Sequence, residues 1–123
     1  MIKGQVNSRL EAILTLEVHD AAGIGNNIQA IVDTGFGGFL TLPTSAIRSF
    51  ELSSLGRQRG ILADGTSVFF DLYAGSVQWN GKKRSVEIHA ADAEPLAGMA
   101  LLAGHQLTIH VKDGGRVEVE PKA

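Results

Sequence analysis

The sequence predicts an all-β fold with one or two short helices, and three of its features support that prediction. Apolar and polar residues alternate along most segments, which is typical of strands with one buried face. Glycine, asparagine and aspartate gather between these segments, at positions where hairpin turns are expected. No long helical segment joins two strands, so the chain lacks the βαβ units of a parallel α/β fold.

The first expected hairpin leads to an aspartate. Apolar residues occupy every second position from Leu10 to Val18, with polar or charged residues between most of them. Turn-forming residues follow at 21–27, and a second apolar run at 28–32 leads directly to Asp33. We expect these two strands to pair with each other.

One short helix is expected in the middle of the chain. The apolar residues at 39–42 form a short strand that ends at Pro43. Thr44 is expected to cap a helix that runs through Phe50, because a threonine hydroxyl can accept a hydrogen bond from a free N–H of the first turn.

Two further hairpins are expected after this helix. Residues 59–63 and 66–78 flank the sequence Ala-Asp-Gly-Thr as the strands of a long hairpin. The dipeptide Asn80-Gly81 marks a two-residue turn between strands at 76–79 and 82–90, because both of its residues tolerate positive φ.

The C-terminal part predicts a second short helix and a last hairpin. Residues 99–103 are too few for a freestanding helix, but Gly104 is suited to end one packed turn. The strands 105–112 and 116–120 then pair around the turn residues 113–115.

Composition is that of one small domain spanning residues 1–123, and it narrows the classes of function. The net charge of −2 offers no electrostatic basis for binding nucleic acid or an anionic membrane surface. The chain contains no cysteine, which excludes disulfides and thiol catalysis, and no apolar run approaches the length of a membrane span. The start of the sequence has no charged-then-apolar leader, so the expected location is the cytoplasm.

Four histidines raise the question of a metal site, which their spacing does not support. His105 and His110 are five residues apart in an expected strand and therefore point to opposite faces. No helical pair of histidines and no cysteine accompanies them, so we expect no metal and place His19, His89, His105 and His110 on exposed strands. Serine-hydrolase and phosphate-binding motifs do not occur either.

The most informative stretch is the triplet Asp33, Thr34 and Gly35, which follows the apolar strand 28–32. A carboxylate at the end of a buried strand suits acid/base chemistry, and the glycine N–H can donate a hydrogen bond to it. The triplet occurs once. Because water activation by paired aspartates needs one ionised and one protonated carboxyl group, such a chain completes its site only by two-fold self-association. The alternative is an aspartate that caps its own turn.

The surroundings of the triplet strengthen this interpretation. The sequence IVDTGFGGFLTLP is followed by the turn ADGT at 63–66 and then by LAGMALLAG at 96–104. In this order the chain, over about residues 28–111, resembles the single-domain aspartic proteases related to retropepsins, and most closely the small prokaryotic group with a DTGF motif. The resemblance implies a small closed, acid-protease-like β-barrel that forms a symmetric homodimer. It also implies hydrolysis of peptide or protein substrates without a cofactor.

The resemblance assigns roles to individual residues. Asp33 is implied as the catalytic carboxylate, Thr34 as a hydroxyl that bonds across the dimer axis, and Gly35 as a contact for both substrate and carboxylate. The ADGT turn, in which Asp64 and Gly65 are expected to need positive φ, is implied to be a flap over an extended peptide. Gly98 lies in the segment that crosses behind the loop and supports it. Flap and substrate-wall roles fall on Phe36, Ile61, Leu62, Ala63, Asp64, Gly65 and Thr66.

Four positions depart from the retropepsin pattern. Phe36 stands where those enzymes usually have a small residue, although the DTGF group has phenylalanine there. Gly37 and Met99 replace an aspartate and an arginine that pair near the subunit boundary, and Ala100 replaces a polar residue. Two other classes of protein therefore remain open: a peptide-binding dimer of the same fold without catalysis, and a β-barrel module for self-association in which the triplet is coincidental.

Overall fold

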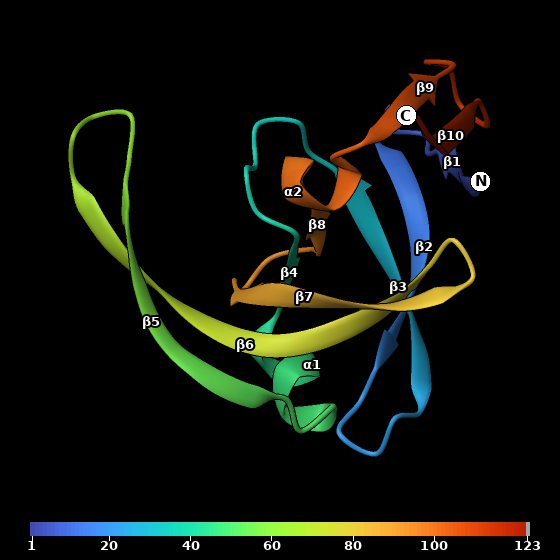
Figure 1. Ribbon diagram of the computed structural model, residues 1–123. Coiled ribbons are helices and arrows are strands. Elements are labelled where there is room, and N and C mark those ends of the chain that lie inside the picture. Colours follow the sequence, from blue (N-terminus) through green and yellow to red (C-terminus); the bar gives the residue numbers. More distant parts are fainter. Residues whose placement is uncertain (123) are drawn as a thin grey trace.

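A computed structural model describes residues 1–122 and confirms that the chain is mostly β (Figure 1). Its ten strands belong to one sheet, and its two helices are short. The elements are β1 (Ile2–Val6), β2 (Ala12–His19), β3 (Gly25–Val32), β4 (Leu40–Leu42), α1 (Thr44–Ser49), β5 (Ser53–Ile61), β6 (Ser67–Trp79), β7 (Lys82–Ala90), β8 (Leu96–Ala97), α2 (Met99–Leu102), β9 (His105–Ile109) and β10 (Arg116–Pro121).

The order of the strands brings the ends of β3 and β8 together. Across the sheet the strands follow the order β5-β6-β7-β4-β8-β3-β2-β1-β10-β9. One further residue pair, Val18 with Val77, joins β2 to β6. The pairings therefore run from β6 through β7, β4, β8, β3 and β2 back to β6. Most neighbours are antiparallel, but β3 with β8 and β4 with β7 are parallel.

The core is formed by the inward-facing residues of the alternating strands. On β2, Leu14, Leu16 and Val18 are buried and the glutamate and threonine between them are exposed, as the sequence predicts. Complete burial of one such side chain contributes about 1.5–3 kcal/mol to stability. Strands from the whole length of the chain contribute to the same cluster through Leu40, Leu42, Val77, Ile88, Leu101, Val117 and Val119.

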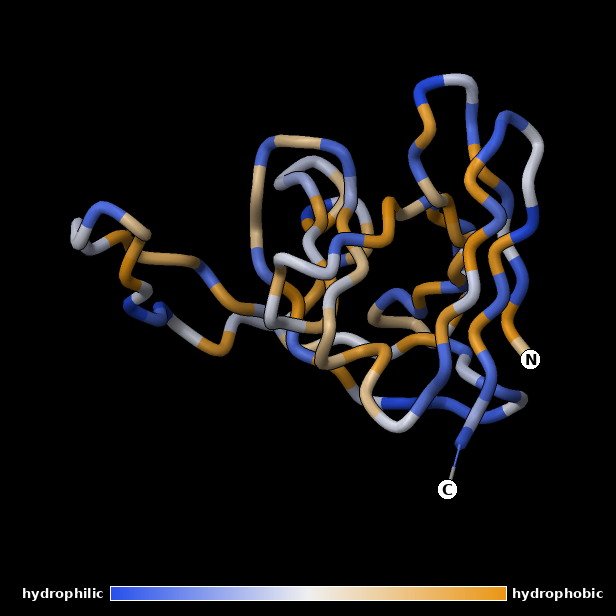
Figure 2. The backbone as a smooth tube through the Cα atoms, turned by 90° about the horizontal axis from the view of Figure 1, so that it is seen from above, coloured by the Kyte–Doolittle hydropathy of each residue, from blue (hydrophilic) through white to orange (hydrophobic). Residues whose placement is uncertain are grey.

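The hairpin of β5 and β6 extends beyond the core as a long curved arm, defined here as residues 56–70 (Figure 1). Figure 2 shows the arm leaving the body on one side, while both termini lie on the other. A break in the strand register between Ser54 and Gly56, where Gly56 has φ +92°, marks the base of the arm. Ile61 and Phe69 on the arm are 71% and 65% exposed, so the arm presents apolar side chains to solvent.

Several sequence-based predictions are confirmed. Strands β2 and β3 pair along their whole length, and β9 pairs with β10. Asn80 and Gly81 both have positive φ, 51° and 78°, as expected of a two-residue hairpin turn between β6 and β7. Gly104, with φ 78°, follows α2 and ends it.

Other predictions are wrong or incomplete. Thr44 does not cap α1: Pro43 occupies the cap position, and the Thr44 hydroxyl donates a hydrogen bond to Asp92 at 3.1 Å. Strand β5 begins at Ser53 and not at 59, because pairing with β6 holds a polar segment in an extended conformation. The strand β1 was not expected, and it is inserted between β2 and β10. Strand β9 ends at Ile109, so His110 lies outside it.

Candidate active site

Asp33 follows the last residue of β3 and begins a tight turn. Its backbone N–H donates to Ala97 at 2.9 Å, and its carbonyl oxygen accepts from the N–H of Phe36 at 3.1 Å. The carboxylate Oδ1 accepts a hydrogen bond from Gly35 N at 2.9 Å, which is the contact expected from the sequence. A Cβ on residue 35 would lie 3.2 Å from that oxygen, so glycine allows the close approach. The half-buried carboxylate is thus fixed in orientation while remaining accessible.

The loop that carries this turn, residues 33–39, rests on the segment that begins at Gly98. Gly98 donates from its N–H to Phe39 at 3.0 Å, Met99 to Phe36 at 2.8 Å, and Ala100 to Gly38 at 3.1 Å. A Cβ on Gly98 would meet the Gly38 oxygen at 2.3 Å, so only glycine fits between the loop and α2. Three main-chain hydrogen bonds therefore hold the 33–39 loop against this segment.

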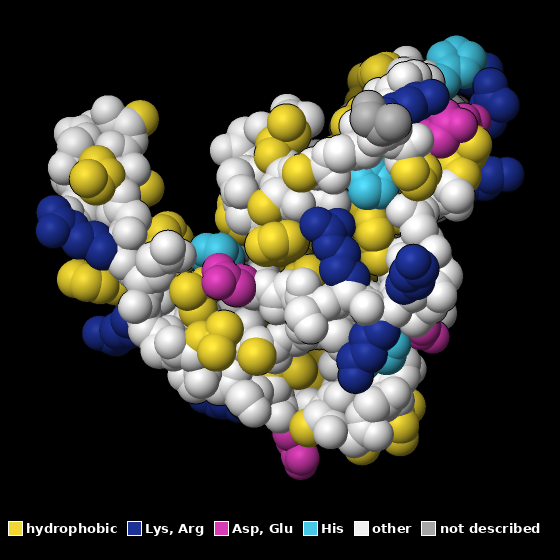
Figure 3. Space-filling model, in the orientation of Figure 1, with side chains coloured by type: hydrophobic (Ala, Val, Ile, Leu, Met, Phe, Trp, Pro, Cys, Tyr) yellow, Lys and Arg dark blue, Asp and Glu magenta, His cyan; other side chains and the backbone are white. Residues whose placement is uncertain are grey.

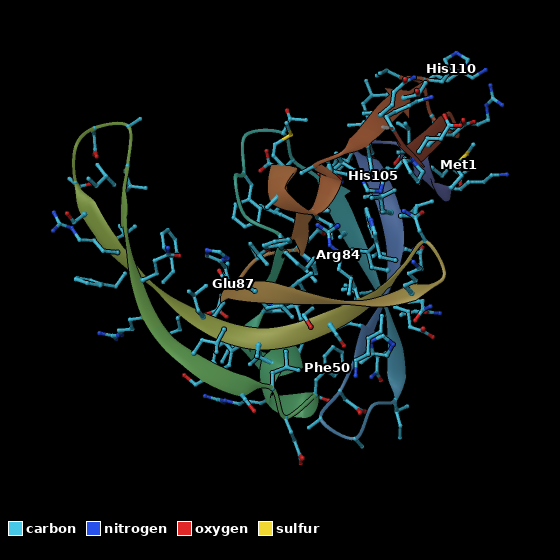
Figure 4. All side chains as sticks on the ribbon, viewed as in Figure 1. Met1, Phe50, Arg84, Glu87, His105 and His110 are labelled. Atoms are coloured by element: carbon cyan, nitrogen blue, oxygen red, sulfur yellow. The ribbon has the colours of Figure 1, made fainter. Side chains whose placement is uncertain are left out.

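Arg84 supports the same segment from β7. Its guanidinium donates to the carbonyl oxygens of Leu101 at 2.9 Å and Ala100 at 3.3 Å, which are free at the end of α2. It also lies over the rings of Phe39, at 5.4 Å, and Trp79, at 5.7 Å. Figure 4 shows Arg84 beneath α2. The sequence interpretation missed Arg84, because its contacts join strand β7 to segments distant in the chain.

The tip of the arm is a compact turn formed by residues 62–66. Leu62 N donates to Thr66 O at 2.8 Å, and Asp64 Oδ1 accepts from the Thr66 hydroxyl and from Thr66 N at 3.0 Å. These hydrogen bonds, the hydroxyl first, lower the pKa of Asp64, against a smaller opposing effect of desolvation. Gly65 has the expected positive φ, 87°, whereas Asp64 does not, so the tip needs one glycine and not two permissive residues.

The structure brings some of the predicted site residues together and leaves others apart. Asp33, Gly35, Phe36 and Gly98 meet within the hydrogen-bonded loop, and Thr34 is exposed beside them. The arm tip, which carries Ile61, Leu62, Ala63, Asp64, Gly65 and Thr66, stands apart from the loop (Figure 1). Figure 3 shows a hollow between the arm and the body, with hydrophobic side chains along its wall.

A cluster of three rings connects the 33–39 loop to the base of the arm. His89 on β7 meets the ring of Phe36 edge-on, with centroids 5.3 Å apart, and the ring of Phe70 at 5.7 Å. His89 is half-buried and its Nδ1 is enclosed without a hydrogen-bond partner, so the expectation of a histidine on an exposed strand is wrong. Burial lowers the pKa of His89, and the nearby Glu87, labelled in Figure 4, partly opposes this effect.

The described residues offer no other centre of comparable chemistry. Residues 1–122 contain no group of three or more His, Cys, Asp or Glu side chains arranged to hold a metal ion. No helix of this part of the chain is both long enough and apolar enough to cross a membrane. A cavity of about 690 Å³ lies away from Asp33, on the side of β1, β2 and β3, and its wall includes Arg9, Glu94 and Arg116.

No family model matches the chain, and no curated protein matches its sequence. The geometry of the site and the resemblance of its motifs therefore carry the functional argument.

Proposed function

We propose that the protein is an aspartic endopeptidase in which two Asp33 carboxylates meet across the axis of a homodimer. The observation that carries this proposal is the turn Asp33–Gly35 seated on Gly98, with its carboxylate oriented by a glycine N–H and still accessible. This turn, the arm and the segment 96–104 follow one another in the order of the retropepsin-related proteases.

The proposed chemistry uses one water molecule and no cofactor. One Asp33, ionised, accepts a proton from the water as the water oxygen attacks the scissile carbonyl carbon. The partner's Asp33, protonated, donates its proton to the carbonyl oxygen. Collapse of the resulting tetrahedral diol breaks the C–N bond, and the leaving nitrogen takes up a proton from the dyad. No covalent bond forms between enzyme and substrate.

The fold proposed for each subunit is a small closed barrel. The circuit of pairings from β6 back to β6 through β2 supports this description. Thr34, exposed next to Asp33, is the residue we propose to bond to its counterpart in the partner subunit. The absence of cysteine is compatible with the cytoplasmic location proposed for this dimer.

The substrate is proposed to be an extended peptide that lies between the arm and Gly35. Exposed main-chain groups near an arm tip and a loop can pair with such a peptide as another strand would. Phe36 on the loop and Ile61 and Leu62 on the arm supply apolar walls. A net charge of −2 favours neither nucleic acid nor an anionic membrane as partner.

Cleavage of a diverse peptide mixture over a range of pH tests the proposal, with Asp33→Asn as the matched control. Asparagine keeps the size of the side chain and its acceptor oxygen but cannot act as the base. Cleavage by the natural protein and none by Asp33→Asn is the expected result. Equal cleavage by both proteins would contradict the proposal.

A peptide-binding dimer without catalysis is the second candidate, and two observations favour it. Phe36 fills a place where retropepsins carry a small residue, and Ala100 offers no polar side chain to the loop, which it contacts only through its backbone N–H. Binding of peptides without cleavage, by both the natural protein and Asp33→Asn, would identify this function. Neither binding nor cleavage would instead favour a β-barrel module that serves self-association alone.

A further inference from the structure

We propose that His89 determines part of the substrate specificity by forming a hydrogen bond with an uncharged polar side chain of the bound peptide. This inference rests on the proposed function. His89 lies between Phe36 of the 33–39 loop and Phe70 of the arm, with ring centroids 5.3 Å and 5.7 Å away. It therefore occupies the place where the two proposed walls of the substrate site join.

Two glycines make room for the flanking rings. A Cβ on Gly38 would lie 2.5 Å from Phe36 Cζ and 3.0 Å from His89 Cε1. A Cβ on Gly60 would lie 2.4 Å from Phe70 Cε2. Because a side chain at either position would displace a ring, the three rings form a closely packed wall, and His89 brings the polar atoms to it.

The enclosed nitrogen of His89 has nothing to bind within the described residues. Its neighbours on the adjacent strands are Leu72 and Thr41. Leu72 has no polar side-chain atom, and the Thr41 hydroxyl instead accepts a hydrogen bond from Leu96 N at 2.9 Å. A phenylalanine would pack against the same rings without leaving a polar atom unpaired, which is destabilising. The histidine is therefore explained better by binding than by packing.

The chemistry of the wall selects the kind of side chain it accepts. Burial keeps the His89 ring neutral at neutral pH, since Glu87 opposes this effect only in part. A neutral imidazole offers one donor and one acceptor and no charge with which to attract an acidic side chain. The rings of Phe36 and Phe70 favour an apolar body. Tyrosine, an aromatic ring with a hydroxyl at its end, meets both requirements.

Pairs of peptides that differ only by Tyr against Phe, at each position around the cleaved bond, test this inference. We expect the natural protein to show, at one position, kcat/KM up to about tenfold higher for Tyr, the range of one neutral hydrogen bond. In His89→Phe the ratio at that position is expected to fall to about one, with cleavage of the Phe peptide retained. The control is His110→Phe, which replaces an exposed histidine outside β9, at the far side of the molecule (Figure 4).

Each outcome decides between the two levels of the argument. No preference for Tyr in the natural protein, or an unchanged preference in His89→Phe, would overturn the role of His89 and leave the protease intact. No cleavage of any peptide by the natural protein would overturn both. A thermal melt shows whether His89→Phe folds. Because the inference holds that phenylalanine fits this space, failure to fold would also contradict it.

Discussion

Asp33 depends for its position on Gly98, which belongs to a distant part of the chain. The carboxylate is oriented by Gly35, the turn is closed by Phe36, and the loop as a whole is hydrogen-bonded to residues 98–100. A glycine at 98 lets the backbone of the loop and of α2 approach each other. The acid/base function proposed for Asp33 therefore requires the glycine as much as the carboxylate.

Gly98→Ala is expected to disturb the 33–39 loop. Its Cβ would lie 2.3 Å from the Gly38 oxygen, a contact with backbone that cannot move aside cheaply. Overpacking of this kind costs about 1–3 kcal/mol of unfolding free energy. Urea unfolding and peptide cleavage measure the loss of stability and of activity.

Gly37→Ala is the matched control for this change. A Cβ there meets nothing within 4 Å, and we expect the unfolding free energy to change by no more than about 0.5 kcal/mol. If both variants behaved alike, the close contact at Gly98 would not explain the position of the loop.

His89 is expected to make stability depend on pH on the acid side. Its pKa is lowered in the folded protein by burial, from an ordinary value of about 6.5. As the pH falls through that value, the unfolded chain takes up a proton that the folded protein does not, so the unfolding free energy decreases. Above it, the group contributes no pH dependence.

Urea unfolding of the natural protein and His89→Phe, from about pH 8 down to about pH 5, measures this effect. The loss of stability toward acid is expected to be smaller in His89→Phe, since the other titrating groups are common to both proteins. Parallel curves would show that burial of His89 does not resist its protonation.

At this scale the sequence predicts Asp33, Thr34 and Gly35 as a unit because their relationship is local. The hydrogen bond from Gly35 to Asp33 spans two residues and follows from the turn itself. Neither His89 nor Arg84 carried a comparable signal. Each gains its role from rings or carbonyl oxygens that only the folded chain brings near it.

The arm is the element on which the proposed gating of the site depends. Hydrogen bonds of Asp64, Leu62 and Thr66 close its tip, and Gly65 supplies the positive φ of 87°. Nothing lies within 4 Å of a Cβ at residue 65, so a side chain there affects backbone conformation and not packing.

Gly65→Val is expected to strain the tip while leaving the fold intact. A β-branched residue is disfavoured at positive φ, and the misplaced tip should close poorly over a peptide, which lowers kcat/KM. Gly65→Asn is the control, because asparagine tolerates this conformation and should retain most of the activity. Unchanged kcat and KM in Gly65→Val would remove the arm tip from the proposed site.

Hairpins were predictable because short turns carry their own signals. Asn80 and Gly81 identify the β6–β7 turn, and the alternation along β2 identifies its buried face. The position of β1 was not predictable, since it depends on the edges that β2 and β10 offer it. The early start of β5 likewise depends on its pairing with β6, which overrides the polar character of its first residues.

For the molecule as a whole, the proposal requires two chains for one active site. Each chain carries the triplet once, and water activation by an aspartic dyad needs two carboxyl groups. Specific activity is therefore expected to rise with protein concentration until the dimer is saturated. Activity strictly proportional to concentration, in a sample that sedimentation shows to be monomeric, would contradict a site shared between subunits.

Mixing the natural protein with Asp33→Asn tests the central claim most directly. With random exchange of subunits and inactive mixed dimers, an equal amount of Asp33→Asn should reduce the activity per natural chain to about half, and a ninefold excess to about one tenth. Sedimentation of the same mixtures confirms that the chains associate. Activity per natural chain that stays constant as Asp33→Asn is added, in mixtures shown to contain mixed dimers, would mean that each Asp33 acts alone.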